Sequence, residues 1–164
     1  MGVFDDLYAA NEDYAAAYTD RGLTGRARRG LAVLTCIDSR IDPLAALGLA
    51  PGDAKIIRNA GARVSAETLT TLVLAVYLLG VERVFLMPHT DCGVTKTSDA
   101  DIHARAAEYG IDVRSLDLPL IADQNTVLAR DMLRIRTSPF LPKNIAVDGA
   151  LFDVTTGRLT RVTI

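Results

Sequence analysis

Two groups of polar residues, far apart in the sequence, each follow an apolar segment that is typical of a buried strand. Cys36, Asp38 and Arg40 follow "LAVLT", and His89 and Cys92 follow "VFLMP". Two thiolates and one imidazole are ligands that zinc prefers, and three protein ligands are typical of a catalytic zinc site with an open fourth position. Spacing alone leaves another interpretation open, in which Cys36 is a small buried apolar residue and His89 a structural histidine.

The pair Asp38 and Arg40 favours the zinc site. An arginine can hold a carboxylate with two parallel hydrogen bonds, which fixes the direction of the carboxylate oxygens. A carboxylate held beside an open metal position can orient bound water. A structural zinc site would need a fourth Cys or His ligand, and the sequence contains only two cysteines.

The segments around these residues alternate between strand and helix patterns. Residues 31–36, 54–61 and 81–89 are predicted strands, and 42–49 and 65–80 are predicted helices. This alternation predicts an α/β fold, a mostly parallel central sheet flanked by helices. Ligands in such sheets collect at the carboxyl ends of the strands. If the first and third strands are neighbours, the two polar groups meet at one edge of the sheet.

The rest of the chain after residue 93 is less regular. Residues 99–110 and 123–137 are predicted helices. Residues 144–164 predict a last strand, a turn at Thr156–Gly157 and an antiparallel edge strand at the C-terminus.

The N-terminal segment 3–18 predicts an amphipathic helix, which the polar, arginine-rich segment 19–30 joins to the rest of the chain. The apolar positions of this helix are Phe4, Leu7, Tyr8, Tyr14, Ala15 and Tyr18. Because the linker separates the helix from its own core, we expect it to extend onto a partner subunit, in a homodimer or a larger oligomer built from dimers. The arginines of the linker are interpreted as solvated, with contacts to acidic residues of a partner chain as the alternative.

The length of 164 residues fits one domain, and we predict a single domain over residues 1–164 with 1–30 as its helical arm and linker. The net charge of -2 gives no support for a nucleic-acid partner. No apolar run reaches the roughly 18 residues that a membrane span needs. The acidic start argues against a secretory signal, so we expect a cytoplasmic protein.

In order and position, these motifs resemble those of the β-class carbonic anhydrases, in particular their smaller bacterial and archaeal branch. The likeness covers "CIDSR", "RNAG", "HTDCG" and the C-terminal "FDVTTGRL", and so nearly the whole chain. It implies that Cys36, His89 and Cys92 bind one zinc ion per chain, and that Asp38 and Arg40 form a catalytic dyad beside it. Water is then the fourth ligand, or Asp38 itself in a closed site at lower pH.

The resemblance implies a zinc lyase, a carbonate dehydratase that reversibly hydrates CO2 to bicarbonate and a proton by zinc-bound hydroxide. A hydrolase of carbonyl sulfide or carbon disulfide would use the same zinc site. A zinc-binding protein without turnover is a third interpretation, against which the Asp38–Arg40 dyad argues. Asn59 and Gly61 are candidate substrate-binding residues, through their backbone. His103 lies in a charged helical segment and is interpreted as a surface residue rather than a proton shuttle.

Overall fold

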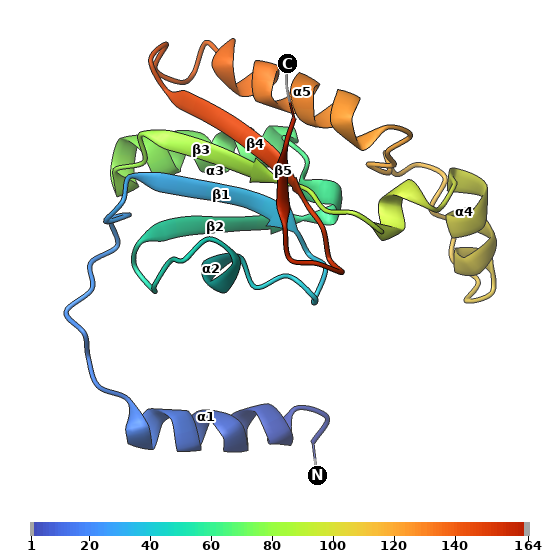
Figure 1. Cartoon of the computed structure of the whole chain (residues 1–164). Helices are drawn as coiled ribbons and strands as arrows, with labels where there is room; N and C mark the ends of the chain where they lie inside the picture. Colours follow the sequence, from blue (N-terminus) through green and yellow to red (C-terminus); the bar gives the residue numbers. More distant parts are fainter. Residues whose placement is uncertain (1, 163–164) are drawn as a thin grey trace.

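A five-stranded sheet forms the centre of the computed structural model, which describes residues 2–162 (Figure 1). The strand order is β2-β1-β3-β4-β5. The strands are β1 (Leu31–Cys36), β2 (Ala54–Asn59), β3 (Arg83–Met87), β4 (Ala146–Phe152) and β5 (Leu159–Arg161). All neighbours run parallel except β5, which is antiparallel to β4. The predicted α/β class, with its mostly parallel sheet and antiparallel C-terminal strand, is confirmed.

The first and third strands are direct neighbours, as the sequence analysis required. Thr35 at the end of β1 pairs with Met87 at the end of β3. β1 lies inside the sheet, and all of its residues except the first are buried. Burial on both faces explains why its sequence is almost continuously apolar instead of alternating.

Helices cover the two faces of the sheet unequally. On one face, α3 (Ala66–Leu79) and α5 (Gln124–Arg136) pack against the sheet through Leu72, Leu128 and Met132. On the other face lies the short helix α2 (Pro43–Ala46), with a smaller core around Val33 and Met87. This smaller core continues into the buried residues Cys36 and Cys92.

Local signals in the sequence account for the helix ends. Asp42 caps α2 by accepting hydrogen bonds from two backbone amides. Ser65 caps α3 through the amide of Thr68, and Gly80 ends that helix in the left-handed conformation. The second strand is shorter than predicted because the chain turns at Ala60–Ala62, where Gly61 has a φ of 75°.

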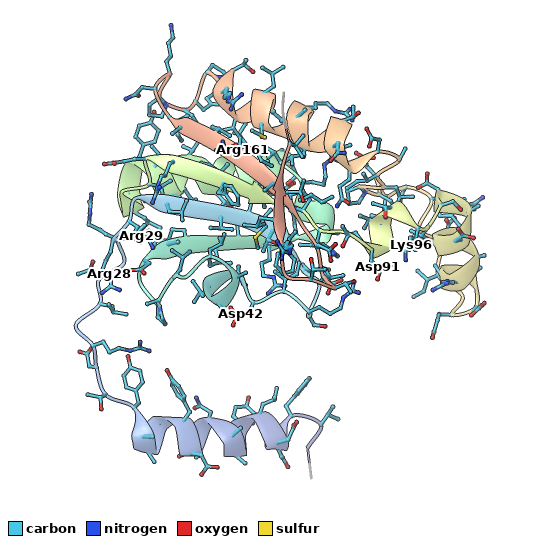
Figure 2. All side chains as sticks on the ribbon, in the orientation of Figure 1. Arg28, Arg29, Asp42, Asp91, Lys96 and Arg161 are labelled. Atoms are coloured by element: carbon cyan, nitrogen blue, oxygen red, sulfur yellow. The ribbon has the colours of Figure 1, made fainter. Side chains whose placement is uncertain are left out.

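The predicted N-terminal helix is present as α1 (Asp5–Ala17), and it lies away from the sheet (Figure 1). None of its residues is buried. Part of the linker packs against the rest of its own chain. Ala27 is buried, and Arg28, which is labelled in Figure 2, forms an ion pair with Asp53. The side chain of Arg28 is still 54% exposed, so the interpretation of this arginine as solvated holds beside the ion pair.

The remaining helix, α4 (Asp99–Ala107), lies beside the carboxyl end of the sheet and also has no buried residue (Figure 1). Among the described helices, none has the length and apolar character needed to cross a membrane.

Candidate metal centre

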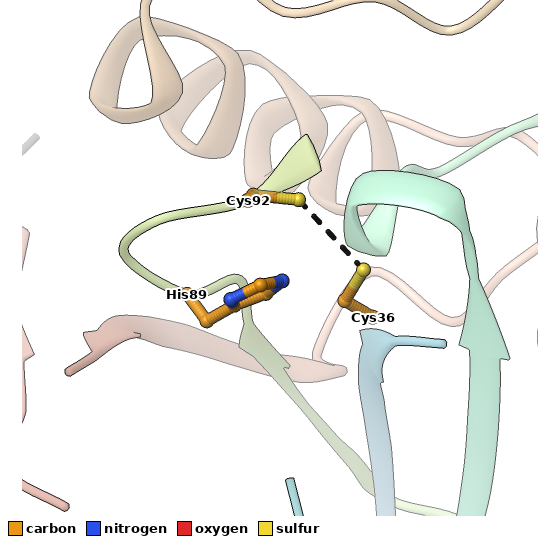
Figure 3. A group of neighbouring side chains, drawn as sticks. All are labelled: Cys36, His89 and Cys92. Carbon is orange, nitrogen blue, oxygen red and sulfur yellow. Dashed lines mark hydrogen bonds between the residues drawn. The ribbon is translucent and has the colours of Figure 1, made fainter. Parts of the chain in front are cut away.

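Three buried side chains converge where β1 and β3 end (Figure 3). Cys36 is the last residue of β1, and His89 and Cys92 lie in the loop that follows β3. Their potential ligand atoms all lie within 4.8 Å of one another. The expectation that the two polar groups meet at one edge of the sheet is confirmed, and it follows from the pairing of β1 with β3.

The spacing of the two sulfur atoms fits a tetrahedral zinc site. The Sγ atoms of Cys36 and Cys92 are 3.8 Å apart. Two Zn–S bonds of about 2.3 Å at a tetrahedral angle would place the sulfurs about 3.8 Å apart, whereas a disulfide bond measures about 2.05 Å. The two thiols are therefore free and not a disulfide, and their contact, drawn as a hydrogen bond in Figure 3, has the spacing that two ligands of one zinc ion would need.

The imidazole of His89 is oriented for the same purpose. Its Nδ1–H donates to the carbonyl oxygen of Thr90 over 2.8 Å, which leaves the lone pair on Nε2. Nε2 is buried and has no hydrogen-bond partner among residues 2–162. A buried polar atom without a partner is costly, and a metal ion bound to Nε2 would remove that cost.

The surroundings of the thiols also fit a cation. Burial raises the pKa of the Cys92 thiol to about 11, so a thiolate at neutral pH requires a nearby positive charge. The backbone amide of Gly61 donates to Sγ of Cys36 over 3.4 Å. The donor set and the Nε2 atom without a partner among the described residues together fit a zinc ion.

Asp38 and Arg40 form a closely bonded pair directly after β1. Arg40 donates from its backbone N and from Nε to Oδ1 of Asp38, over 2.9 and 3.0 Å, and from Nη2 to Oδ2 over 2.7 Å. These bonds to Arg40 hold the pKa of Asp38 well below its usual range. Oδ2 of Asp38 lies 3.7 Å from Nε2 of His89. An ionised carboxylate with a fixed orientation therefore lies directly beside the three ligand atoms.

Asp91 belongs to the same network, and sequence reasoning assigned it no role. Arg40 donates from Nη1 to Oδ2 of Asp91 over 2.8 Å and from Nη2 to its carbonyl oxygen over 3.1 Å. Lys96 bonds to the other carboxylate oxygen of Asp91. The only local signal was the position of Asp91 inside the His-x-x-Cys loop.

Asn59 and Gly61 shape the loop behind the metal ligands. The amide group of Asn59 bonds to the backbone of Arg63 and to the hydroxyl of Thr68. Neither Asn59 nor Gly61 lines the cleft beside the cysteines, although Ala60 between them does. A role of these two residues in substrate binding stays a prediction.

A cleft of about 800 Å³ leads to Cys36, Asp38 and Cys92. Its wall is mainly apolar and comes from the ends of β1 and β3, from α4 and from the loop after α4. The apolar wall residues include Ile37, Val94, Ile102, Leu118, Pro119 and Leu120. Lys96 and Arg105 add positive charge to the cleft, and Asp38 and Asp101 add negative charge. The sequence analysis assigned none of these residues to a cleft, and all of them except Ile37 and Asp38 come from the less regular part of the chain after residue 93.

Comparisons with known proteins agree with this geometry. The carbonic anhydrase family model matches residues 31–116. Beta-carbonic anhydrase 1 of Mycobacterium tuberculosis is 34% identical over 164 residues, which is 99% of both chains. The crystal structure of a carbonic anhydrase from Streptococcus mutans is 33% identical, with a TM-score of 0.91 over 99% of both chains. A carbon disulfide hydrolase of Saccharolobus solfataricus is 25% identical, over 96% of this chain and 87% of its own.

Proposed function

Because the chain belongs to the β-carbonic anhydrase family, we propose that it is a zinc-dependent lyase that reversibly hydrates CO2 to bicarbonate and a proton. We propose Cys36, His89 and Cys92 as the zinc ligands, with one zinc ion per chain, and Asp38 and Arg40 as the catalytic dyad. A cytoplasmic location stays a prediction.

The observation that carries this proposal is the distance of 3.7 Å between Oδ2 of Asp38 and Nε2 of His89, which has no hydrogen-bond partner among the described residues. A purely structural zinc site has four protein ligands and no open position beside which a carboxylate could orient water. A catalytic site needs one, because the attacking oxygen must point a lone pair at the carbon atom of CO2.

Each side chain then has a defined task. Zinc would supply the nucleophile, because coordination lowers the pKa of water from about 16 toward about 7. Asp38 would accept a hydrogen bond from water or hydroxide bound there and so would orient it toward the cleft. Arg40 keeps Asp38 ionised and turned toward the ligand atoms. The mainly apolar cleft wall receives uncharged CO2.

Hydrolysis of carbon disulfide or carbonyl sulfide is the second candidate. The relatives named carbon disulfide hydrolase support it, since they match most of this chain at lower identity. The same ligands and the same carboxylate would serve both reactions. The higher identity to beta-carbonic anhydrase 1 favours CO2.

A side-by-side turnover assay tests the proposal. Zinc-loaded protein is mixed with CO2 in a stopped-flow instrument with a pH indicator, and separately with carbonyl sulfide and carbon disulfide, with release of hydrogen sulfide as the readout. The variant Cys92→Ser serves as the blank. We expect CO2 to be the substrate with the highest kcat/KM. Faster turnover of a sulfur compound would establish the second candidate, and no turnover of any of them would leave a zinc-binding protein.

We further propose that the working form is a homodimer or a larger assembly of dimers, in which α1 packs on a second copy. The helix exposes the apolar side chains of Phe4, Leu7 and Tyr8 and has no buried residue. An isolated helix of 13 residues is marginal in water, so α1 needs a surface to pack against. The outer side of α3 offers exposed apolar residues, among them Leu74 and Tyr77.

A further inference from the structure

The sequence contains the Asp-x-Arg pattern twice, and both copies form the same local structure. In the second copy, Arg114 donates from its backbone N and Nε to Oδ1 of Asp112 over 3.0 and 2.9 Å, and from Nη2 to Oδ2 over 2.6 Å. These are the same three contacts that join Arg40 to Asp38. The pair therefore forms from three consecutive residues, without help from the metal centre.

The two pairs differ in what else touches the arginine. In the part of the chain that the structure describes, Arg114 bonds only to Asp112, and its side chain is 75% exposed. Arg40 is 44% exposed and has a second carboxylate partner in Asp91. Its Nε and Nη2 face Asp38 while Nη1 faces Asp91, so carboxylates hold the guanidinium on two edges.

The backbone directs Asp91 toward Arg40. Asp91 has a φ of 58°, in the left-handed region that Asp and Asn enter more readily than most residues. It stands between His89 and Cys92, so the loop that carries two proposed zinc ligands also carries the second partner of Arg40. Lys96 bonds to the carboxylate oxygen that Arg40 leaves free.

We propose that Asp91 is a positioning residue, which holds Arg40 and through it Asp38 in a fixed place relative to the metal ligands. The inference deepens the proposed function and rests on it. A guanidinium bound on one edge only, as in Arg114, can swing away by breaking its bonds to a single carboxylate. A guanidinium bound on two edges cannot swing without breaking bonds to both carboxylates.

The first test compares three variants by zinc content and by kcat for CO2 at pH 8. Asp91→Gly removes the carboxylate and keeps the left-handed backbone, which glycine adopts freely. We expect it to retain zinc and to lose roughly tenfold in kcat, because a misplaced catalytic group slows the reaction. Asp91→Asn keeps an oxygen acceptor for Arg40 and should stay near the wild-type rate. Asp112→Gly removes the carboxylate of the second Asp-x-Arg pair, which does not line the cleft, and is the matched control. Should Asp91→Gly lose zinc, Asp91→Ser, whose side chain is too short to reach Arg40, replaces it.

A double-mutant cycle separates positioning from a merely structural role. If Asp91 acts through Arg40, Asp91→Gly should cause no further loss of kcat in an Arg40→Ala background. The same loss in both backgrounds would overturn the proposal, and so would a wild-type kcat for Asp91→Gly alone.

NMR of the arginine side chains provides a readout besides activity. A guanidinium held on two edges should give separate signals for its Nη protons, and one that rotates should give averaged signals. We expect separate signals for Arg40 in the wild type, averaged signals in Asp91→Gly, and averaged signals for Arg114 in both proteins. Averaged Arg40 signals in the wild type would contradict the proposal. If the wild type does not hydrate CO2, the proposed function fails, and this measurement still decides whether Asp91 positions Arg40.

Discussion

Oδ2 of Asp38 lies 3.7 Å from Nε2 of His89, the nitrogen that has no hydrogen-bond partner among the described residues. This separation is too long for a hydrogen bond. The Nδ1–H bond to Thr90 leaves a lone pair on Nε2, and Asp38, held by Arg40 over 2.7 Å, is an acceptor that cannot occupy it, so this lone pair is available to a metal ion.

Replacing either cysteine should remove most of the zinc. Cys36→Ser and Cys92→Ser each delete one of the two sulfurs that lie 3.8 Å apart, and a hydroxyl is a much poorer zinc ligand than a thiolate. We expect elemental analysis to find about one zinc per wild-type chain and well under half of that in each variant. His103→Ala, which changes the only other histidine, should retain its zinc. Full zinc retention in both serine variants would contradict the assignment of the ligands.

Asp38→Asn should retain zinc and lose activity. The amide has almost the same volume as the carboxylate, but it carries no charge for Arg40 and can donate a hydrogen bond where an acceptor is needed. Loss of one oriented transition-state interaction costs about 10²–10³-fold in rate, or about 3–4 kcal/mol. We expect a loss of that size in CO2 hydration at pH 8. Asp112→Asn makes the same change in the same local turn away from the metal centre, and it should leave turnover unchanged. Equal rates for the two variants would show that the dyad assignment is wrong.

Lys96→Gln should raise the pKa of Asp91. Hydrogen bonds from Lys96 and then from Arg40 lower this pKa from 3.8 to about 2. Since the pKa is lower in the folded state, the ionised carboxylate stabilises the fold above about pH 4 and loses this effect as the pH falls toward 2. We expect the carboxyl ¹³C titration midpoint of Asp91 to move upward in the variant. In urea unfolding, the stability difference from wild type should be constant above about pH 5 and shrink below about pH 4. An unchanged midpoint would rule out Lys96 as the main cause.

Gly61→Ala should destabilise the fold more than Gly157→Ala. Both glycines have a φ near 70°, so both substitutions carry the same left-handed strain of about 1–2 kcal/mol. A Cβ at Gly61 would lie 2.8 Å from Cδ1 of Ile121, whereas nothing lies within 4 Å of a Cβ at Gly157. Overpacking adds about 1–3 kcal/mol at Gly61 alone. Urea unfolding measures the free energy of unfolding of each variant. Equal losses of this free energy in the two variants would mean that the side chains around Gly61 move aside without an energetic cost.

A charge on the apolar face of α1 should weaken the assembly. Light scattering at micromolar concentration should give a multiple of 17.6 kDa for the wild type and a smaller mass for Leu7→Asp. Ala9→Asp places the same charge on the opposite face of the helix and is the control. A mass near 17.6 kDa for the wild type would rule out the proposed oligomer.

Much of the metal centre was predictable, because its ligands follow directly from strands with strong patterns. An apolar run that ends on Cys36 and another that ends before His89 locate both groups at the carboxyl ends of parallel strands. Local signals likewise predicted the helices, such as the Ser65 cap and Gly80 at the end of α3. Such features depend on residues that lie close together in the sequence, so the sequence alone is enough to predict them.

Features that depend on contacts between distant segments were not predictable in this way. The apolar cleft brings together α4 and the loop at Leu118–Leu120 with the end of β1. The linker contact of Arg28 with Asp53 joins two segments on either side of β1. In each case the sequence shows suitable residues, but the path of an irregular loop decides which of them meet.

The two Asp-x-Arg turns show this division most directly. Residues 38–40 and 112–114 make the same three bonds, so the sequence by itself determined the local pair in both places. The sequence also places the first pair directly after Cys36, but only the tertiary structure brings the loop after β3 to it. The pairing of β1 with β3 brings His89 and Asp91 to Asp38 and Arg40, and the loop around Asp112 meets no such partner among the described residues.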